Sequence, residues 1–253
     1  MPTSFYKKFV YIICLLIVLP LKSAWAFNLP SHEEVLNAHP EIVLEEIIKD
    51  LPQSASLDNP ALQLVNRDNP LEEEMWIDFV YSNEGLPFNY MAYESYYSLM
   101  SAGLEAGFSY SNVSAYRSMN EQAINRENRI QSYLNEGLSY DEALYWTNAY
   151  YAPVDASEHL TGLALDLLGY DWTSIGGGLH GDYGYQASAI WLADHAHEHG
   201  FILRYPEGRT DVTGYNYEPW HFRYVGQDHA QFIYDHNLVL EEYLALIAYR
   251  DSL

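Results

Sequence analysis

The sequence predicts an α+β fold, with a small antiparallel sheet flanked by helices and preceded by a helical extension. Segments with strand character are few, and helical segments of varied length separate them without a regular strand–helix repeat. This arrangement favours α+β over a doubly wound parallel sheet. Helix starts are marked by three capping boxes, in which a serine precedes a glutamate by three residues: Ser31/Glu34, Ser118/Glu121 and Ser139/Glu142.

Residues 27–61 are expected to form a helical extension and a linker. The stretch 31–51 has helical periodicity, and Pro40 interrupts it, so two short helices are favoured over one. The composition of PQSASLDNPA (52–61) is typical of a linker. The sequence leaves open whether this extension packs on the following domain or acts as a spacer.

Residues 62–253 are expected to form the main domain. Apolar periodicity and stop signals predict helices over 89–106, 118–134, 139–150 and 186–199, and another after Gln227. Alternating or apolar runs predict strands over 108–117, 162–168, 201–206 and 221–226.

The first residues predict a secretory signal peptide over 1–26. Lys7 and Lys8 precede the apolar run FVYIICLLIVLPL, and Ala24-Trp25-Ala26 provides a small-x-small cleavage site. The alternative is a transmembrane anchor, but a span needs roughly 20 apolar residues, which this run does not reach. We therefore expect no stable membrane insertion after cleavage and a secreted, periplasmic or cell-wall-associated protein.

The composition excludes several kinds of site and partner. Cys14 is the only cysteine and lies in the predicted signal peptide, so the mature chain has no disulfide and no thiolate metal site. The formal net charge of −23 argues against nucleic acid and anionic membrane surfaces as partners. Catalysis would depend on oxygen and nitrogen groups.

Two stretches combine histidine with a carboxylate. In SEHLTGLALDL (157–167), His159 precedes a predicted strand, on which Asp166 points away from the face of Leu163, Leu165 and Leu167. A carboxylate among apolar neighbours is costly unless it is paired or binds metal. In TGYNYEPWHFRYVG (213–226), Pro219 disfavours helix at Glu218. Glu218 and His221 can share a site only if the strand bulges between them or Glu218 lies in the preceding loop.

Each pair alone is a common structural feature, but together they suggest a metal site. His159, Asp166 and His221 could be three ligands of one Zn²⁺ per chain, with water at the open fourth position of a catalytic site. Glu218 would then be the general base.

The chain resembles the VanY-type D-alanyl-D-alanine carboxypeptidases and the related L,D-carboxypeptidases, zinc enzymes that trim peptidoglycan stem peptides. The resemblance runs through residues 62–226 and rests on LVNRDNPL (64–71), SAYRSMNEQ (114–122), WLADHAHEHGFILRYPEG (191–208) and the two stretches above. It implies a fold like that of Hedgehog and the D,D-peptidases. It also implies zinc on His159, Asp166 and His221, with Glu218 as the base.

The same resemblance implies which residues bind the C-terminal end of the substrate peptide. It implies that Arg117 binds the terminal carboxylate or the developing oxyanion, and that Gln122 and Ser157 help to hold the peptide. Two departures stand out. Asp155 occupies a position where the family usually has glycine. In the helix before GFILRYP, three histidines replace the asparagine and tyrosine or lysine that are commoner in relatives: His195, His197 and His199. They could form a second metal site or simply face solvent.

The sequence thus predicts a secreted zinc carboxypeptidase that removes a C-terminal D-alanine from peptidoglycan stem peptides, with D,D- favoured over L,D-specificity. The alternative is a non-catalytic peptidoglycan-binding relative with a structural zinc. The intact Glu218 argues against that alternative, because a pure binder needs no base.

Overall fold

The core of the fold is a four-stranded antiparallel sheet. The computed structural model describes residues 27–253, so the predicted signal peptide lies outside the described residues. The strand order is β3-β4-β6-β5, with bounds β3 (Tyr110–Ser114), β4 (Ala164–Gly169), β5 (Phe201–Leu203) and β6 (His221–Tyr224). All neighbouring pairs are antiparallel. The predicted α+β class is confirmed.

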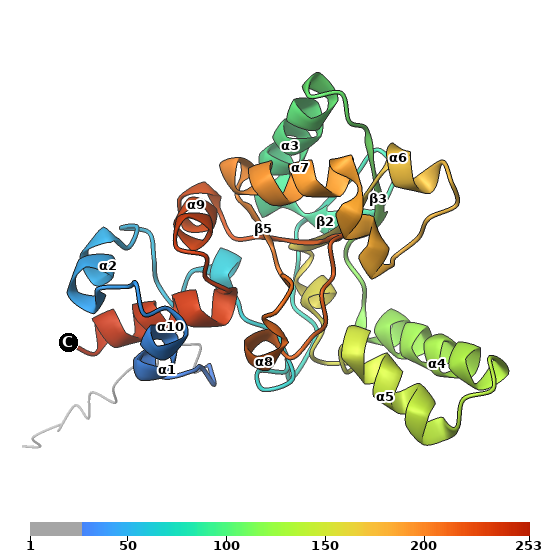
Figure 1. Cartoon of the computed structure of the whole chain (residues 1–253), viewed down its shortest axis with the longest axis horizontal. Helices are drawn as coiled ribbons and strands as arrows, with labels where there is room; N and C mark the ends of the chain where they lie inside the picture. The colour runs from blue at the N-terminus through green and yellow to red at the C-terminus, as the bar shows by residue number, and fades with distance from the viewer. Residues whose placement is uncertain (1–26) are drawn as a thin grey trace, which may run out of the picture.

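Helices cover one side of this sheet (Figure 1). α3 (Tyr93–Glu105) and α7 (Ala187–His195) contribute Leu99 and Leu192 to a buried cluster that also contains Leu165, Leu167 and Phe222 of the strands. The predicted helix 186–199 is divided, because α7 ends at His195 and a 3₁₀ turn, η5 (Ala196–His199), follows.

Some short elements were not predicted. β1 (Phe79–Tyr81) and β2 (Pro87–Asn89) form a separate two-stranded antiparallel sheet. The one-turn helices α6 (Tyr170–Thr173) and α8 (Thr210–Thr213) connect strands to the next elements. The 3₁₀ turns η1 (Pro60–Leu62) and η4 (Gly181–Tyr185) were also not predicted. Each has only a few residues, too few to show a periodic pattern in the sequence. The predicted helix 89–106 begins as a 3₁₀ turn, η2 (Tyr90–Ala92), and continues as α3.

A helical hairpin stands beside the sheet. α4 (Met119–Asn135) and α5 (Tyr140–Tyr150) pack on each other (Figure 1), and the predicted capping boxes at Ser118 and Ser139 are both present. In each box the serine side chain accepts from the backbone N–H of the glutamate three residues later, which satisfies a helix-end donor. The hairpin supplies one wall of the pocket described below.

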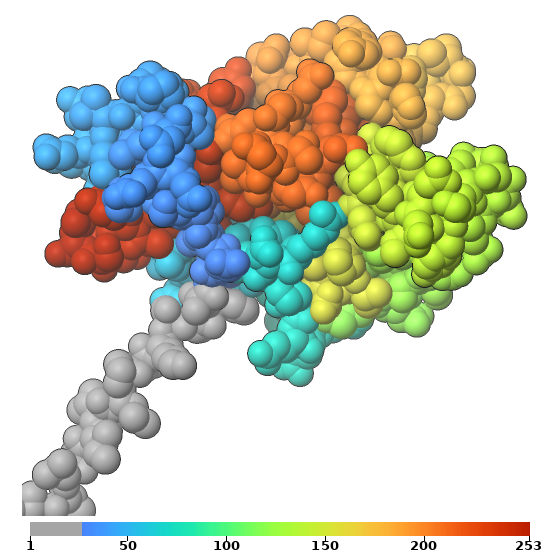
Figure 2. All heavy atoms as spheres, turned by 60° about the horizontal axis from the view of Figure 1, so that its bottom comes forward, coloured from blue at the N-terminus to red at the C-terminus, as the bar shows by residue number. Residues whose placement is uncertain are grey.

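The N-terminal extension packs on the C-terminal helix. α1 (His32–Ala38) and α2 (Leu44–Asp50) place Val35 and Ile47 in one buried cluster with Leu244 of α10 (Leu240–Asp251). α9 (Gln227–Asp235) joins the same cluster through Ile233. Figure 2 shows the extension against the C-terminal segment. Across residues 27–253, no helix is both long and apolar enough to cross a bilayer.

Candidate metal centre and substrate pocket

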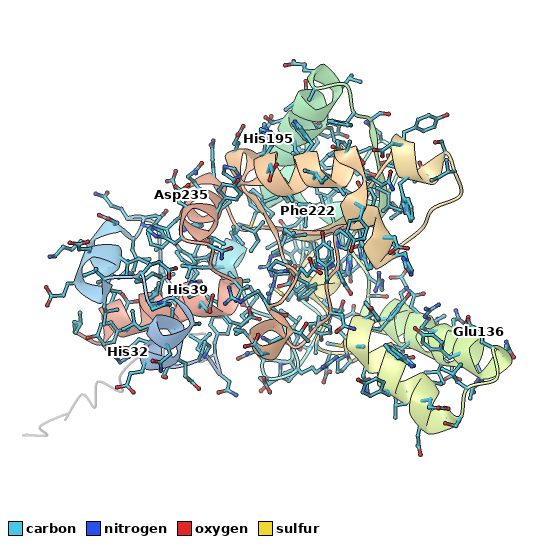
Figure 3. All side chains as sticks on the ribbon, in the orientation of Figure 1. His32, His39, Glu136, His195, Phe222 and Asp235 are labelled. Carbon is cyan, nitrogen blue, oxygen red and sulfur yellow. The ribbon has the colours of Figure 1, made fainter. Side chains whose placement is uncertain are left out.

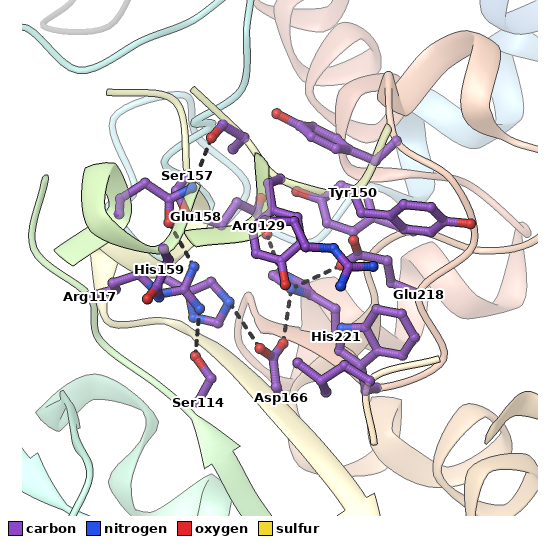
Figure 4. A pocket seen from close by; sticks show the side chains of 18 of the residues that line it. Ser114, Arg117, Arg129, Tyr150, Ser157, Glu158, His159, Asp166, Glu218 and His221 are labelled. Atoms are coloured by element: carbon purple, nitrogen blue, oxygen red, sulfur yellow. Dashed lines mark hydrogen bonds and ion pairs between the residues drawn. The ribbon is translucent and has the colours of Figure 1, made fainter. Parts of the chain in front are cut away.

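Two neighbouring strands and a short turn bring the predicted ligands together. His159 lies in the 3₁₀ turn η3 (Glu158–Thr161), just before β4, and Gly162 ends that turn with a left-handed φ of 65°. Asp166 of β4 is directly opposite His221 of β6 in the sheet register. One potential ligand atom from each of these three buried side chains lies within 4.8 Å of the others (Figure 4).

The ring orientation of His159 is fixed by the backbone. Its Nδ1 lies 2.6 Å from the carbonyl oxygen of Ala115, and a carbonyl can only accept, so Nδ1 carries the proton. Nε2 therefore presents its lone pair toward Asp166 Oδ2, 3.3 Å away. Burial lowers the pKa of His159, so its neutral, ligating form is favoured.

His221 is held from behind by Glu158. His221 Nδ1 lies 3.2 Å from Asp166 Oδ1, while Nε2 faces Glu158 Oε2 at 3.3 Å. The other oxygen of Glu158 accepts from Arg204 Nε at 2.7 Å and from Arg223 Nη1 at 3.0 Å. Glu158 was not among the site residues predicted from the sequence. The available signal was a pair of arginines on apolar strands, which need buried acids as partners.

These contacts determine the ionisation states of Glu158, Asp166 and His221. Burial alone would raise the pKa of Glu158, but Arg204 and Arg223 outweigh it and hold that pKa well below its usual range. Burial likewise opposes ionisation of Asp166, yet the hydrogen bond and positive charge of His221 keep its pKa low. Burial would lower the pKa of His221, but hydrogen bonds to Asp166 and Glu158 raise it to about 9.

The donor set fits a divalent metal. Two imidazole nitrogens and a carboxylate suit zinc. Asp166 Oδ1 is buried, and apart from its ion pair with His221 Nδ1 it has no hydrogen-bond partner within the described part of the chain, as expected for an oxygen whose natural partner is a cation. The three residues border a cavity of about 700 Å³, which leaves room for solvent and substrate beside the ligands.

Glu218 belongs to a turn rather than to the strand. The backbone N–H of His221 donates to the carbonyl of Glu218 at 3.1 Å, which closes a tight turn around Pro219 and Trp220. This turn places Glu218 Oε2 3.6 Å from His221 Nδ1, on the pocket side. The sequence left open whether the strand bulges between Glu218 and His221 or Glu218 lies in the preceding loop, and the structure shows the loop position. Burial raises the pKa of Glu218 to about 8.

Arg117, Gln122 and Ser157 all line the same cavity. Arg117 donates through Nη1 to Gln122 Oε1 at 2.6 Å and through Nη2 to Ser114 Oγ at 2.8 Å. Gln122 is anchored in turn by its donation to the carbonyl of Ala152 at 2.8 Å. Both partners of Arg117 are neutral, so its positive charge is not compensated by them and can attract an anion.

The histidine cluster does not assemble. His195, at the end of α7 (Figure 3), faces Glu198 at 3.1 Å, and His199 pairs with Ser98 Oγ at 2.9 Å. His197 stacks on Tyr234 with ring centroids 3.6 Å apart. Across residues 27–253, the metal-compatible group is that of His159, Asp166 and His221 alone. A second metal site is therefore not formed, and the solvent-facing alternative is wrong for His197, which is buried.

The departure at Asp155 leaves the pocket intact. Asp155 is exposed and is not among the residues that line the cavity. Among the described non-glycine residues, positive φ occurs at Asn237 and not at Asp155. The loop therefore does not depend on glycine at this position.

Comparison with known proteins decides the family. Residues 87–227 match the family model described as VanY, D-alanyl-D-alanine carboxypeptidase. The chain belongs to the VanY family. Among relatives, it is 37% identical over 146 residues to the putative carboxypeptidase YodJ of Bacillus subtilis (strain 168). The match covers 58% of this chain and 49% of YodJ, so the chain spans about half the length of that relative.

Solved VanY-family structures share the fold. The crystal structure of a mutant of the vancomycin resistance D,D-pentapeptidase VanY from a VanB-type cassette, in complex with Zn(II), aligns with a TM-score of 0.66 at 30% identity. The alignment covers 74% of this chain and 99% of that one. VanYB in complex with D-alanine-D-alanine aligns with a TM-score of 0.64 at 29% identity, covering 73% of this chain and 97% of that one.

Proposed function

We propose that this chain is a secreted, zinc-dependent carboxypeptidase that removes the C-terminal D-alanine from peptidoglycan stem peptides, with D,D- favoured over L,D-specificity. The observation that carries the proposal is the convergence of Glu218 with the His159, Asp166 and His221 group in one cavity. Similarity to VanYB, solved with D-alanine-D-alanine, supports the choice of substrate. The sequence of residues 1–26 supports export.

The geometry supports a role for each of these residues. His159, Asp166 and His221 would hold one zinc ion, which would supply Lewis-acid polarisation of the scissile carbonyl and acidify a water molecule. Glu218 accepts the proton of the attacking water and passes it to the leaving amine of D-alanine. Its burial keeps bulk water from competing for that proton. Arg117 and Gln122, with Ser157 nearby, bind the end of the peptide.

The experiment that tests this function is mass spectrometry of defined tetrapeptide and pentapeptide stems after incubation with zinc-loaded protein. Loss of one alanine from the pentapeptide, abolished by a chelator and restored by zinc, supports the D,D-carboxypeptidase. Loss of alanine from the tetrapeptide alone would instead indicate L,D-specificity. Retention on cell walls with no change of mass would support the non-catalytic binder.

Replacing Arg117 by lysine should reduce kcat/KM for such pentapeptides roughly 10- to 150-fold. Lysine keeps the charge but cannot grip a carboxylate through two parallel hydrogen bonds, and bonds to charged groups contribute about 1.5–3 kcal/mol. The measurement is steady-state kinetics on a pentapeptide and its C-terminal amide. If wild-type protein hydrolyses the amide as well as the free acid, Arg117 does not read the terminal carboxylate.

Zinc binding should release about one proton per ion at pH 7. His221 holds a proton below its pKa of about 9, whereas a metal binds only the neutral ring, so the ion must displace that proton. Zinc affinity is therefore expected to rise with pH up to about 9. Titration calorimetry in buffers of different ionisation enthalpy counts the protons. An affinity that stays constant between pH 6.5 and 8.5 would contradict the assignment of His221 as a ligand.

A further inference from the structure

Two arginines in the cavity lack a carboxylate partner. The chain has 35 Asp and Glu against 12 Lys and Arg, so an arginine easily finds an acid. Four of the described arginines do so: Arg204, Arg209, Arg223 and Arg250. Arg67 and Arg126 instead donate to backbone carbonyl groups. Arg117 and Arg129 make no ion pair within residues 27–253, and both line the cavity.

Arg129 is held in place but keeps free donors. Its Nη2 donates to the hydroxyl of Tyr133 at 2.8 Å, and its guanidinium lies 4.1 Å from the centre of the Tyr133 ring. Its Nε is buried and has no hydrogen-bond partner in the described structure. Figure 4 shows Arg129 among the side chains that surround the pocket. A buried, oriented donor without a partner is costly, so it suggests a ligand that arrives later.

The position of Arg129 along α4 determines how far it lies from Gln122 and from the end of the peptide. Gln122, which is bonded to Arg117, and Arg129 are seven residues apart, so they share a helix face and lie about 10 Å apart along the axis. Asn125 lies between them and also lines the cavity. An extended peptide advances about 3.3 Å per residue. Consider a peptide that has its terminal carboxylate at Arg117 and runs along α4. The residue that lies beside Arg129 is then two or three residues upstream of the peptide's C-terminal residue.

We propose that Arg129 forms a second anion subsite, which binds a carboxylate of the substrate peptide two or three residues upstream of its C-terminal residue. This inference rests on the proposed function, because it places the peptide's end at Arg117. The formal net charge of −23 makes the rest of the protein repel an acidic peptide. The guanidinium of Arg129 therefore favours peptides that carry a carboxylate, and it favours that carboxylate at one position of the peptide.

The test compares matched peptides that end in D-Ala-D-Ala and carry Glu or Gln at the third or fourth position from the C-terminus. For wild-type protein we expect kcat/KM to be about tenfold higher with Glu at one of the two positions, mainly through KM, as for a charge-assisted pair. Arg129→Gln should erase that ratio, and Arg129→Lys should retain part of it. Lys49→Gln removes one positive charge from the surface of α2, far from the pocket in sequence and fold, and should leave the ratio unchanged.

A binding measurement separates this proposal from the proposed function. Equilibrium affinities for the uncleaved peptides are measured with Glu218→Gln and with the double variant Glu218→Gln/Arg129→Gln. Preference for Glu over Gln in the first protein, and its loss in the second, supports the subsite even if no peptide is hydrolysed. The proposal is overturned if the Glu and Gln peptides bind with equal affinity at both positions. It is also overturned if replacing Arg129 lowers the affinity for the two peptides equally. Arg129 would then be a structural partner of Tyr133.

Discussion

Glu218→Gln is expected to lower kcat for D-alanine release by roughly 10²–10⁴-fold, the range that general acid–base catalysis contributes. Glutamine has nearly the same shape but cannot accept the proton of the attacking water. The carboxylate lies 3.6 Å from a nitrogen of His221 but is not part of the three-residue metal group. Zinc should therefore remain bound, so the change appears in kcat at full metal content.

Two measurements make this result decisive. Metal analysis must show about one zinc per chain in both proteins, and kcat must be measured at saturating pentapeptide. Glu207→Gln is the matched control, because Glu207 is exposed and does not line the cavity. If the Glu218 variant holds stoichiometric zinc and its turnover is unchanged, the assignment of the base is wrong.

The helices were predictable where a local pattern defines them. The capping boxes at Ser31, Ser118 and Ser139 begin helices as expected, because the serine–glutamate pair satisfies its own helix end without help from distant residues. The β1–β2 pair was missed because each strand has few residues and neither alternates clearly. Packing of the extension on α10 depends on contacts across most of the chain, which no local pattern specifies.

The candidate ligands were predictable for a different reason. Asp166 on an apolar strand required a partner, and the antiparallel register places it directly opposite His221. The geometry of Glu218 was left open, since only the turn at Pro219 and Trp220 reveals that it precedes the strand. Glu158 could not be assigned, because its role depends on Arg204, just after β5, and on Arg223 of β6, which are distant from it in the sequence.

Glu158→Gln is expected to destabilise the metal-free protein by about 3–5 kcal/mol, the usual cost of breaking a buried ion pair. The change leaves the buried guanidinium groups of Arg204 and Arg223 without their shared carboxylate. It also removes the charged acceptor of His221 Nε2, and loss of such a supporting contact typically lowers metal affinity 10- to 100-fold. Urea unfolding and competition with a zinc chelator measure the two effects separately.

Glu241→Gln supplies the comparison that tests this role. Glu241 of α10 accepts from Arg204 at 2.5 and 3.0 Å but makes no contact with His221, so its loss should destabilise the fold and leave zinc affinity nearly unchanged. Glu158 would then support the metal centre specifically, because it links His221 to the arginines. If both variants lose zinc affinity equally, the effect of Glu158 comes from general loosening of the fold, and its place behind His221 has no separate function.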